Sequence, residues 1–221
     1  MMVMTFKALS ALLSYPTAEL KESAGDIRAA LREDGIVPGW LIARLDRLID
    51  EIALTDLLEL QERYVFLFDR TRSLSLHLFE HVHGESRDRG QAMVDLRALY
   101  EHSGFDADER ELPDFLPMFL EYLSFRPAAE AKMLISEPLA VIAALRERLS
   151  RRKSAYAWVL RSLEAIAEGE PAARDLDALR KAPDDDPNDF DSLDARWEDQ
   201  PVTFGPGDQE CGRTPGAEAR R

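Results

Sequence analysis

The sequence predicts an all-α protein. Apolar residues recur at three- and four-residue spacing almost everywhere up to residue 168, as on the buried face of an amphipathic helix. Strand-like alternation is scarce, and the absence of a fixed-period repeat argues against a solenoid. Hydrophobic residues make up 45% of the 221 residues, which is enough for a core. We therefore expect one compact domain over residues 1–170, with roughly eight to ten helices.

Flanking residues and apolar stripes predict the first four helices. Residues 6–13 form the first stripe, and Pro16 ends it. Thr17 is expected to cap a second helix that reaches about residue 33. A third helix is predicted over residues 40–52, and Thr55 is expected to cap the fourth.

The second half of the domain is predicted in the same way. Residues 92–100 form a stripe that ends at Gly104, which suits the left-handed position after a helix. Pro113 stands where another helix is expected to begin, and a short helix follows it. Ser136 is expected to cap the next helix, and Gly169 closes the last stripe.

Residues 171–221 are expected to form an acidic, largely disordered C-terminal tail that contains proline and glycine. Between residues 184 and 199 one basic residue, Arg196, stands against eight acidic ones, Asp184, Asp185, Asp186, Asp189, Asp191, Asp194, Glu198 and Asp199. Apolar residues such as Phe190 and Trp197 interrupt this acidic stretch. Two interpretations stay open: an idle tail, or a segment that docks on its own core or on a partner.

Charge and cysteine content restrict the partners and the compartment. The net charge is −14, from 42 acidic and 28 basic residues, so we expect no nucleic-acid partner and favour one with a basic segment. Cys211 is the only cysteine, which excludes an intramolecular disulfide and fits a reducing cytosol. The N-terminal residues lack a signal-peptide pattern, and no window approaches the ~18 apolar residues of a membrane span. We expect a cytoplasmic protein without stable membrane insertion.

The segment "HLFEHVHGESRDRG", residues 77–90, holds three of the four histidines. His77, Glu80 and His81 match H-x-x-E-H, which predicts a zinc hydrolase with Glu80 as its general base. Such a site needs about three protein ligands, and nothing in the sequence marks the third. The alternatives are a plain helix end that turns at Gly84 and a recognition surface beside a loop.

Other catalytic patterns are absent from the sequence. It contains neither G-x-x-x-x-G-K-[ST] nor G-x-G-x-x-G, so nucleotide chemistry has no motif to rest on. No serine has a nucleophile-elbow context. We interpret the chain as a binding protein, and we expect no catalytic residue, metal or cofactor of its own.

Three stretches resemble one family. Residues 62–105, "ERYVFLFDRTRSLSLHLFEHVHGESRDRGQAMVDLRALYEHSGF", are similar to the NarJ family of nitrate reductase assembly chaperones, and so are "ELPDFLPMFLEYLSF" and the opening "FKALSALLSYPTAEL". The similarity extends over most of residues 5–170. The wider TorD-like group carries an E-x-P-D-H signature, and the matching positions here are Glu111, Pro113 and Asp114, with Phe115 in place of the histidine.

The resemblance implies a fold and a role. It implies the single all-helical domain of the TorD-like chaperones. Such a chaperone binds the apo catalytic (alpha) subunit of respiratory nitrate reductase, chiefly through its N-terminal peptide. It holds that subunit competent for insertion of the molybdenum cofactor and an iron–sulfur cluster before membrane assembly, and it is not part of the mature enzyme. A maturation chaperone for another molybdopterin enzyme is the alternative.

A helical peptide with an apolar face is expected to lie in a groove between helices. The candidate partner-binding residues combine apolar side chains with polar groups that suit a basic peptide: Tyr64, Phe68, His77, Phe79, Glu80, His81, His83, Glu85, Asp88, Arg89, Met93, Glu111, Pro113, Asp114 and Phe115. For the apolar members the alternative is an ordinary place in the core.

Overall fold

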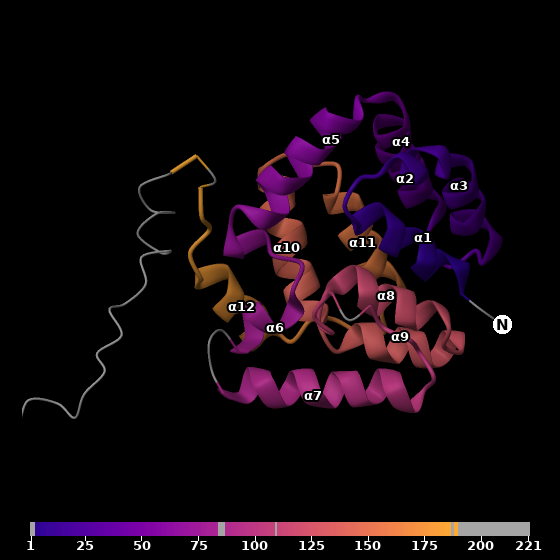
Figure 1. Cartoon of the computed structure of the whole chain (residues 1–221). Coiled ribbons are helices and arrows are strands. Elements are labelled where there is room, and N and C mark those ends of the chain that lie inside the picture. The colour runs from indigo at the N-terminus through magenta and orange to yellow at the C-terminus, as the bar shows by residue number, and fades with distance from the viewer. Residues whose placement is uncertain (1–2, 84–86, 109, 187, 190–221) are drawn as a thin grey trace, which may run out of the picture. The chain divides into compact units, whose positions relative to one another are not determined.

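The computed structural model describes residues 3–83, 87–108, 110–186 and 188–189 (Figure 1). Helices form throughout these residues, and in place of a strand they contain one isolated antiparallel bridge, between His77 and Phe115. None of the described helices is long and apolar enough to cross a membrane. The prediction of an all-α fold is therefore confirmed.

The described residues contain twelve α-helices and two shorter turns. In chain order the α-helices are α1 (Met4–Leu13), α2 (Ala18–Glu22), α3 (Ala24–Glu33), α4 (Gly39–Leu54), α5 (Leu57–Tyr64), α6 (Leu78–His83), α7 (Arg87–His102), α8 (Leu116–Ser124), α9 (Ala128–Ser136), α10 (Leu139–Arg151), α11 (Ala157–Ile166) and α12 (Ala173–Lys181). A π-helical turn, Val65–Asp69, and a 3₁₀ turn, Arg72–Leu74, lie between α5 and α6.

Helix α1 lies in the core of this unit. It packs against α3 on one side and α8 on the other, and Figure 1 shows it running between them. Its sequence is apolar almost all round, and Phe6, Leu9 and Leu13 are fully buried. The hydroxyl of Ser10 donates to the backbone oxygen of Pro117 at 2.6 Å, which ties α1 to α8. A helix that is hydrophobic on most of its surface belongs inside a helical domain, and α1 is placed accordingly.

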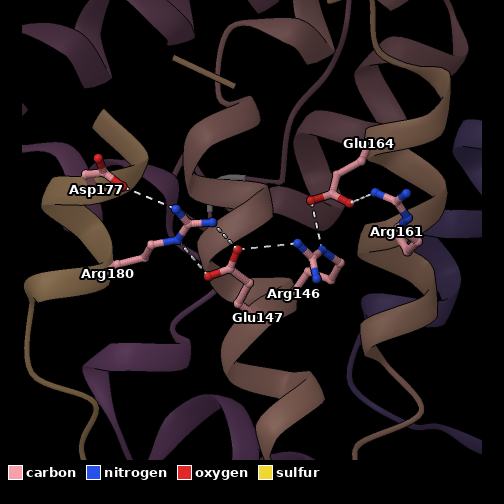
Figure 2. Close-up of polar contacts among 6 residues, drawn as sticks. All are labelled: Arg146, Glu147, Arg161, Glu164, Asp177 and Arg180. Atoms are coloured by element: carbon pink, nitrogen blue, oxygen red, sulfur yellow. Dashed lines mark hydrogen bonds and ion pairs between the residues drawn. The ribbon is translucent and has the colours of Figure 1, made fainter. Parts of the chain in front are cut away.

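Helix α12 extends the helical unit beyond the predicted boundary at residue 170. The chain remains one compact unit to Asn188, and α12 packs against α10. The side chain of Arg148 is buried, and its guanidinium donates to the backbone oxygens of Ser73 at 2.7 Å and Leu179 at 2.9 Å. Ion pairs also link α12, α10 and α11 in a row (Figure 2). Residues 173–181, predicted to belong to the tail, are therefore a helix fixed to α10.

Several predicted helix ends are confirmed. The hydroxyl oxygen of Thr17 accepts the N–H of Leu20 at 3.2 Å, so Thr17 caps α2. Gly104 and Gly169 have φ angles of 72° and 92° in the left-handed region that favours glycine after a helix.

Three predicted boundaries are wrong. The helix expected after Thr17 is divided into α2 and α3 at Ser23. Asp56, instead of Thr55, caps α5, because its carboxylate accepts the N–H groups of Leu58 and Glu59. Ser136 ends α9 and does not cap α10, because its hydroxyl donates to the oxygen of Lys132 and accepts the N–H of Glu168. The adjacent Asp56 sets the start of α5, and the bond from the distant Glu168 occupies Ser136 at the end of α9.

Candidate functional site

Asp114 joins the histidine segment to the residues before α8. Its backbone oxygen accepts the N–H of Leu78 at 3.0 Å, and its carboxylate accepts the N–H of Phe79 at 2.9 Å. The carboxylate also accepts the Nδ1–H of His77 at 3.2 Å. Asp114 is fully buried, so in this state it caps α6 from a position distant in the sequence and presents no carboxylate to a partner.

His77 and His81 have opposite protonation preferences. Burial lowers the pKa of His77, but the hydrogen bond to Asp114 and nearby carboxylates outweigh burial, so this pKa is raised above its ordinary value. The Nε2 atom of His81 lies 2.8 Å from the backbone oxygen of Ser75, so it carries the proton of that hydrogen bond. Burial lowers the pKa of His81. The neutral form of His81 is therefore favoured.

The H-x-x-E-H residues are not arranged on one helical face. α6 begins at Leu78, so His77 precedes the helix that holds Glu80 and His81. His77 faces Asp114, and His81 faces the carbonyl of Ser75. In the part of the chain that the structure describes, no three histidine, cysteine or acidic side chains are grouped to hold a metal ion.

Other predicted residues gather around α6 and the start of α7. Glu80 pairs with Arg89 at 3.3 Å, which links the two helices, and the ring of Phe79 contacts that of His83. Asp88 is exposed, and Met93 is half-buried further along α7. Glu85 lies outside the described residues.

The residues from 111 to 115 connect this corner to a neighbouring surface. Phe115 packs on His77, with ring centroids 5.2 Å apart, and the backbone oxygen of Pro113 accepts the hydroxyl of Tyr100 at 2.8 Å. Glu111 is exposed. Both Glu111 and Phe115 line a hollow of about 700 Å³ beside α1 and α8.

Tyr64 and Phe68 lie in a separate aromatic cluster of the core. Their rings are 4.8 Å apart, and both contact Tyr156. The hydroxyl of Tyr64 donates to the backbone oxygen of Leu13 at 2.8 Å, and both residues are buried. In this state these two side chains stabilise the packing of α5 against its neighbours. Their predicted contact with a partner stays a prediction.

A groove crosses one face of α1. The 700 Å³ hollow meets a second hollow of about 420 Å³ between α1, α2 and α3, and both are lined by Ser10, Ser14 and Glu121. We call the two hollows together the α1 groove. Its floor includes small or apolar side chains of α1 and α3, such as Ala11 and Ile27. Small side chains on α1 leave room for a ligand above a helix that is otherwise buried.

The rim of the α1 groove is acidic. Among the described residues that line it, two cations, Lys7 and Arg110, accompany six carboxylates, those of Glu19, Asp26, Asp106, Asp108, Glu111 and Glu121. Both cations are already paired, Lys7 with Glu121 and Arg110 with Asp108. The N–H and guanidinium of Arg110 lower the pKa of Asp108, which keeps it charged. The groove therefore favours a ligand with positive charge.

Two of the predicted partner-binding residues, Glu111 and Phe115, line the α1 groove. The helix that forms its floor was predicted from the apolar stripe of residues 6–13, and none of its residues was a candidate for binding. Its small side chains, Ala8, Ser10, Ala11 and Ser14, are the signal that could have indicated a groove.

The sequence of this chain is similar to that of known proteins over most of its length. Residues 39–160 match the family model described as "Nitrate reductase delta subunit". The chain is 41% identical, over 92% of its length and 86% of the relative's, to the nitrate reductase molybdenum cofactor assembly chaperone NarJ of Escherichia coli (strain K12). The chain belongs to the NarJ family.

Two further relatives extend this family relationship. The probable chaperone NarW of Escherichia coli (strain K12) is 37% identical over 90% of this chain and 82% of its own. The probable NarJ of Bacillus subtilis (strain 168) is 34% identical over 74% of this chain and 88% of its own. These NarJ-family matches span the histidine segment and the α8 region on which the resemblance was based.

Proposed function

We propose that this chain is an assembly chaperone for respiratory nitrate reductase. It binds the apo catalytic subunit, chiefly through that subunit's N-terminal peptide, and holds it competent for insertion of the molybdenum cofactor and an iron–sulfur cluster. It acts in the cytoplasm, does no catalysis and leaves before the enzyme is complete. The relationship to chaperones named for this assembly supports the role.

The α1 groove is the binding site that we propose for the peptide. An amphipathic helix places its apolar face in a groove between helices. The floor made by Ala11 and Ile27 suits an apolar face, and the carboxylates at the rim suit basic side chains beside it. Such complementary charge increases the rate of encounter and selects the register of the peptide. This acidic groove is the observation that carries the proposal.

Calorimetric titration with a peptide from the N-terminus of the catalytic subunit tests the proposal. We expect binding at micromolar concentrations. Ala11→Phe fills the groove and should weaken binding by at least roughly tenfold, because the apolar face loses its place. Ala43→Phe is the matched control, since Ala43 is exposed on α4 and lines neither hollow. Equal affinity of both variants would remove the groove from the proposal.

Charge reversal at the rim tests the electrostatic part separately. Glu111→Lys should slow association and weaken its dependence on salt, because it removes one of the carboxylates that attract the peptide. Glu33→Lys, at an exposed position outside the groove, is the control for net charge. The same association rate in both variants would contradict local steering.

Two competing functions make different predictions. A chaperone for another molybdopterin enzyme should bind the N-terminal peptide of that enzyme more tightly than the nitrate reductase peptide. A zinc hydrolase built on His77, Glu80 and His81 should retain stoichiometric zinc in elemental analysis. Either result would replace the proposed function.

A further inference from the structure

A basic hollow lies where α10 turns into α11, separate from the α1 groove. Its volume is about 500 Å³, and its polar and aromatic walls are Arg146, Ser150, Lys153, Ser154, Trp158 and Arg161. None of these residues lines the α1 groove. An inference about the basic hollow is therefore independent of the proposed peptide site.

The charge of the basic hollow is opposite to that of the chain. Residues 146–161 contain six basic residues and one acidic residue, in a protein with a net charge of −14. Among the described residues, the lining of the hollow contains three cations and no carboxylate, while Glu147 and Glu164 pair with the arginines from outside the lining. Positive charge gathered in one concave place attracts small anions, even on an acidic protein.

A carboxylate behind the wall orients two of these cations. Glu164 accepts Nε–H of Arg146 at 2.9 Å and Nη1–H of Arg161 at 2.7 Å (Figure 2). The side chain of Glu164 is only 9% exposed, and the carboxylate of Glu147 also lies 3.5 Å from the guanidinium of Arg146. Each guanidinium has five N–H donors, and the contacts with Glu164 and, for Arg146, with Glu147 leave others available for a ligand. The arginines are thus held in place before a ligand arrives.

Lys153 and Trp158 add a positive charge and a flat ring to the hollow. Among the described residues Lys153 is the only one other than glycine with a positive φ, 55°, and its ammonium forms no ion pair there. A residue held in this unfavourable conformation often has a function. The guanidinium of Arg44 lies 4.8 Å from the ring centre of the half-buried Trp158. Trp158 also lines the hollow, where a planar ligand can contact it.

We propose that the basic hollow binds a small ligand that carries both phosphate and a planar ring, of the nucleoside diphosphate class. Planar guanidinium groups suit phosphate oxygens, and the hydroxyls of Ser150 and Ser154 provide further donors. Trp158 supplies a surface for the ring. The volume of about 500 Å³ lies in the range of roughly 300–1,000 Å³ of small-ligand sites. A long polyanion is disfavoured by the net charge of the protein.

Titration calorimetry of the full-length chain at low ionic strength tests this site. ADP, pyrophosphate and adenosine are the three probes, because they supply both groups, phosphate alone and the ring alone. We expect ADP to bind more tightly than either of the others. No binding of ADP at millimolar concentration, or equal affinity for ADP and pyrophosphate, would overturn the proposal. Tighter binding of a poly-aspartate peptide than of ADP would overturn it as well.

Two variants assign the binding to the hollow. Lys153→Gln removes the free charge, and Trp158→Leu removes the ring surface; each should weaken ADP binding by roughly tenfold. Lys132→Gln, on α9 and outside all the hollows described, is the matched control. Because Trp158→Leu disturbs packing, thermal melts must show it folded, and Lys153→Gly provides a second variant with relaxed backbone. Unchanged ADP affinity in Lys153→Gln and Lys153→Gly would overturn the assignment.

Discussion

Replacement of Asp114 by alanine should destabilise the protein strongly, because this buried carboxylate holds α6 to the residues before α8. It accepts the N–H of Phe79 at 2.9 Å and the ring N–H of His77 at 3.2 Å. The substitution removes a helix cap and leaves a backbone donor unsatisfied. We expect the free energy of unfolding to fall by about 2–4 kcal/mol. For a loss of about 3 kcal/mol, Tm should fall by roughly 6–12 °C.

Asp56→Ala is the matched control for this measurement. Asp56 also accepts two backbone N–H groups at a helix start, but it is exposed and caps its own helix. Its loss should cost only about 1 kcal/mol, because water satisfies the freed donors. Urea unfolding of both variants gives the comparison. If Asp114→Ala lowers the free energy of unfolding no more than Asp56→Ala does, the cap between distant segments stabilises the protein less than we expect.

The pH dependence of stability provides a second readout for Asp114. The folded state raises the pKa of His77, so protonated His77 contributes stability that is complete below its unfolded pKa of about 6.5. That contribution is lost as pH rises through the raised folded pKa. Asp114→Asn should therefore lose more stability at pH 5.5 than at pH 8.5.

His77→Gln isolates this effect from the contribution of His81. Burial lowers the pKa of His81, so its contribution is complete above the unfolded pKa and is lost as pH falls. In the wild-type protein the contributions of His77 and His81 to stability change with pH in opposite directions. Only the difference in stability between variants is therefore informative. Adding Asp114→Asn to His77→Gln should produce no further pH dependence. Equal losses at pH 5.5 and 8.5 in Asp114→Asn would refute the coupling.

Three other perturbations test the C-terminal part of the chain. Arg148→Met should lower the free energy of unfolding by about 2–4 kcal/mol in urea titrations, because the buried oxygens of Ser73 and Leu179 lose their donor. Glu147→Gln breaks the two-bond pair with Arg180 (Figure 2) and should cause only a small loss of stability, which should disappear when unfolding is measured in 1 M NaCl. A chain that ends at Asn188 should keep its affinity for the peptide in calorimetry, whereas loss of binding would favour an interaction protein whose acidic tail does the work.

The sequence was sufficient for the class of fold because the helical signal is local. Stripes of apolar residues, Thr17 as a cap and Gly104 after a helix each act within one or two turns of the chain. The boundaries that failed depend on more distant groups. The hydroxyl of Ser136 accepts the backbone N–H of Glu168, which follows α11, and no local pattern indicates that bond.

The α1 groove was harder to predict than the fold, for a related reason. Ala11 and Ser14 look like ordinary residues of a packed helix, and only the positions of α2, α3 and α8 make them line a groove. Tyr64 and Phe68 show the reverse case, since their aromatic side chains suggested a binding surface and their contact with a partner stays a prediction. In the structure they contact Tyr156 inside the core. Side-chain type alone does not distinguish a groove from a core when both are apolar.

Asp114 has a structural role that its place in the sequence does not indicate. His77 meets Asp114 because the bridge between His77 and Phe115 brings the imidazole to the carboxylate. Phe115 packs against that same ring. The pair of charges is therefore assembled from two segments that only the fold brings together. It follows that His77→Gln should disturb the α6 corner as Asp114→Asn does, whereas Phe115→His would add a second imidazole that competes for the same carboxylate.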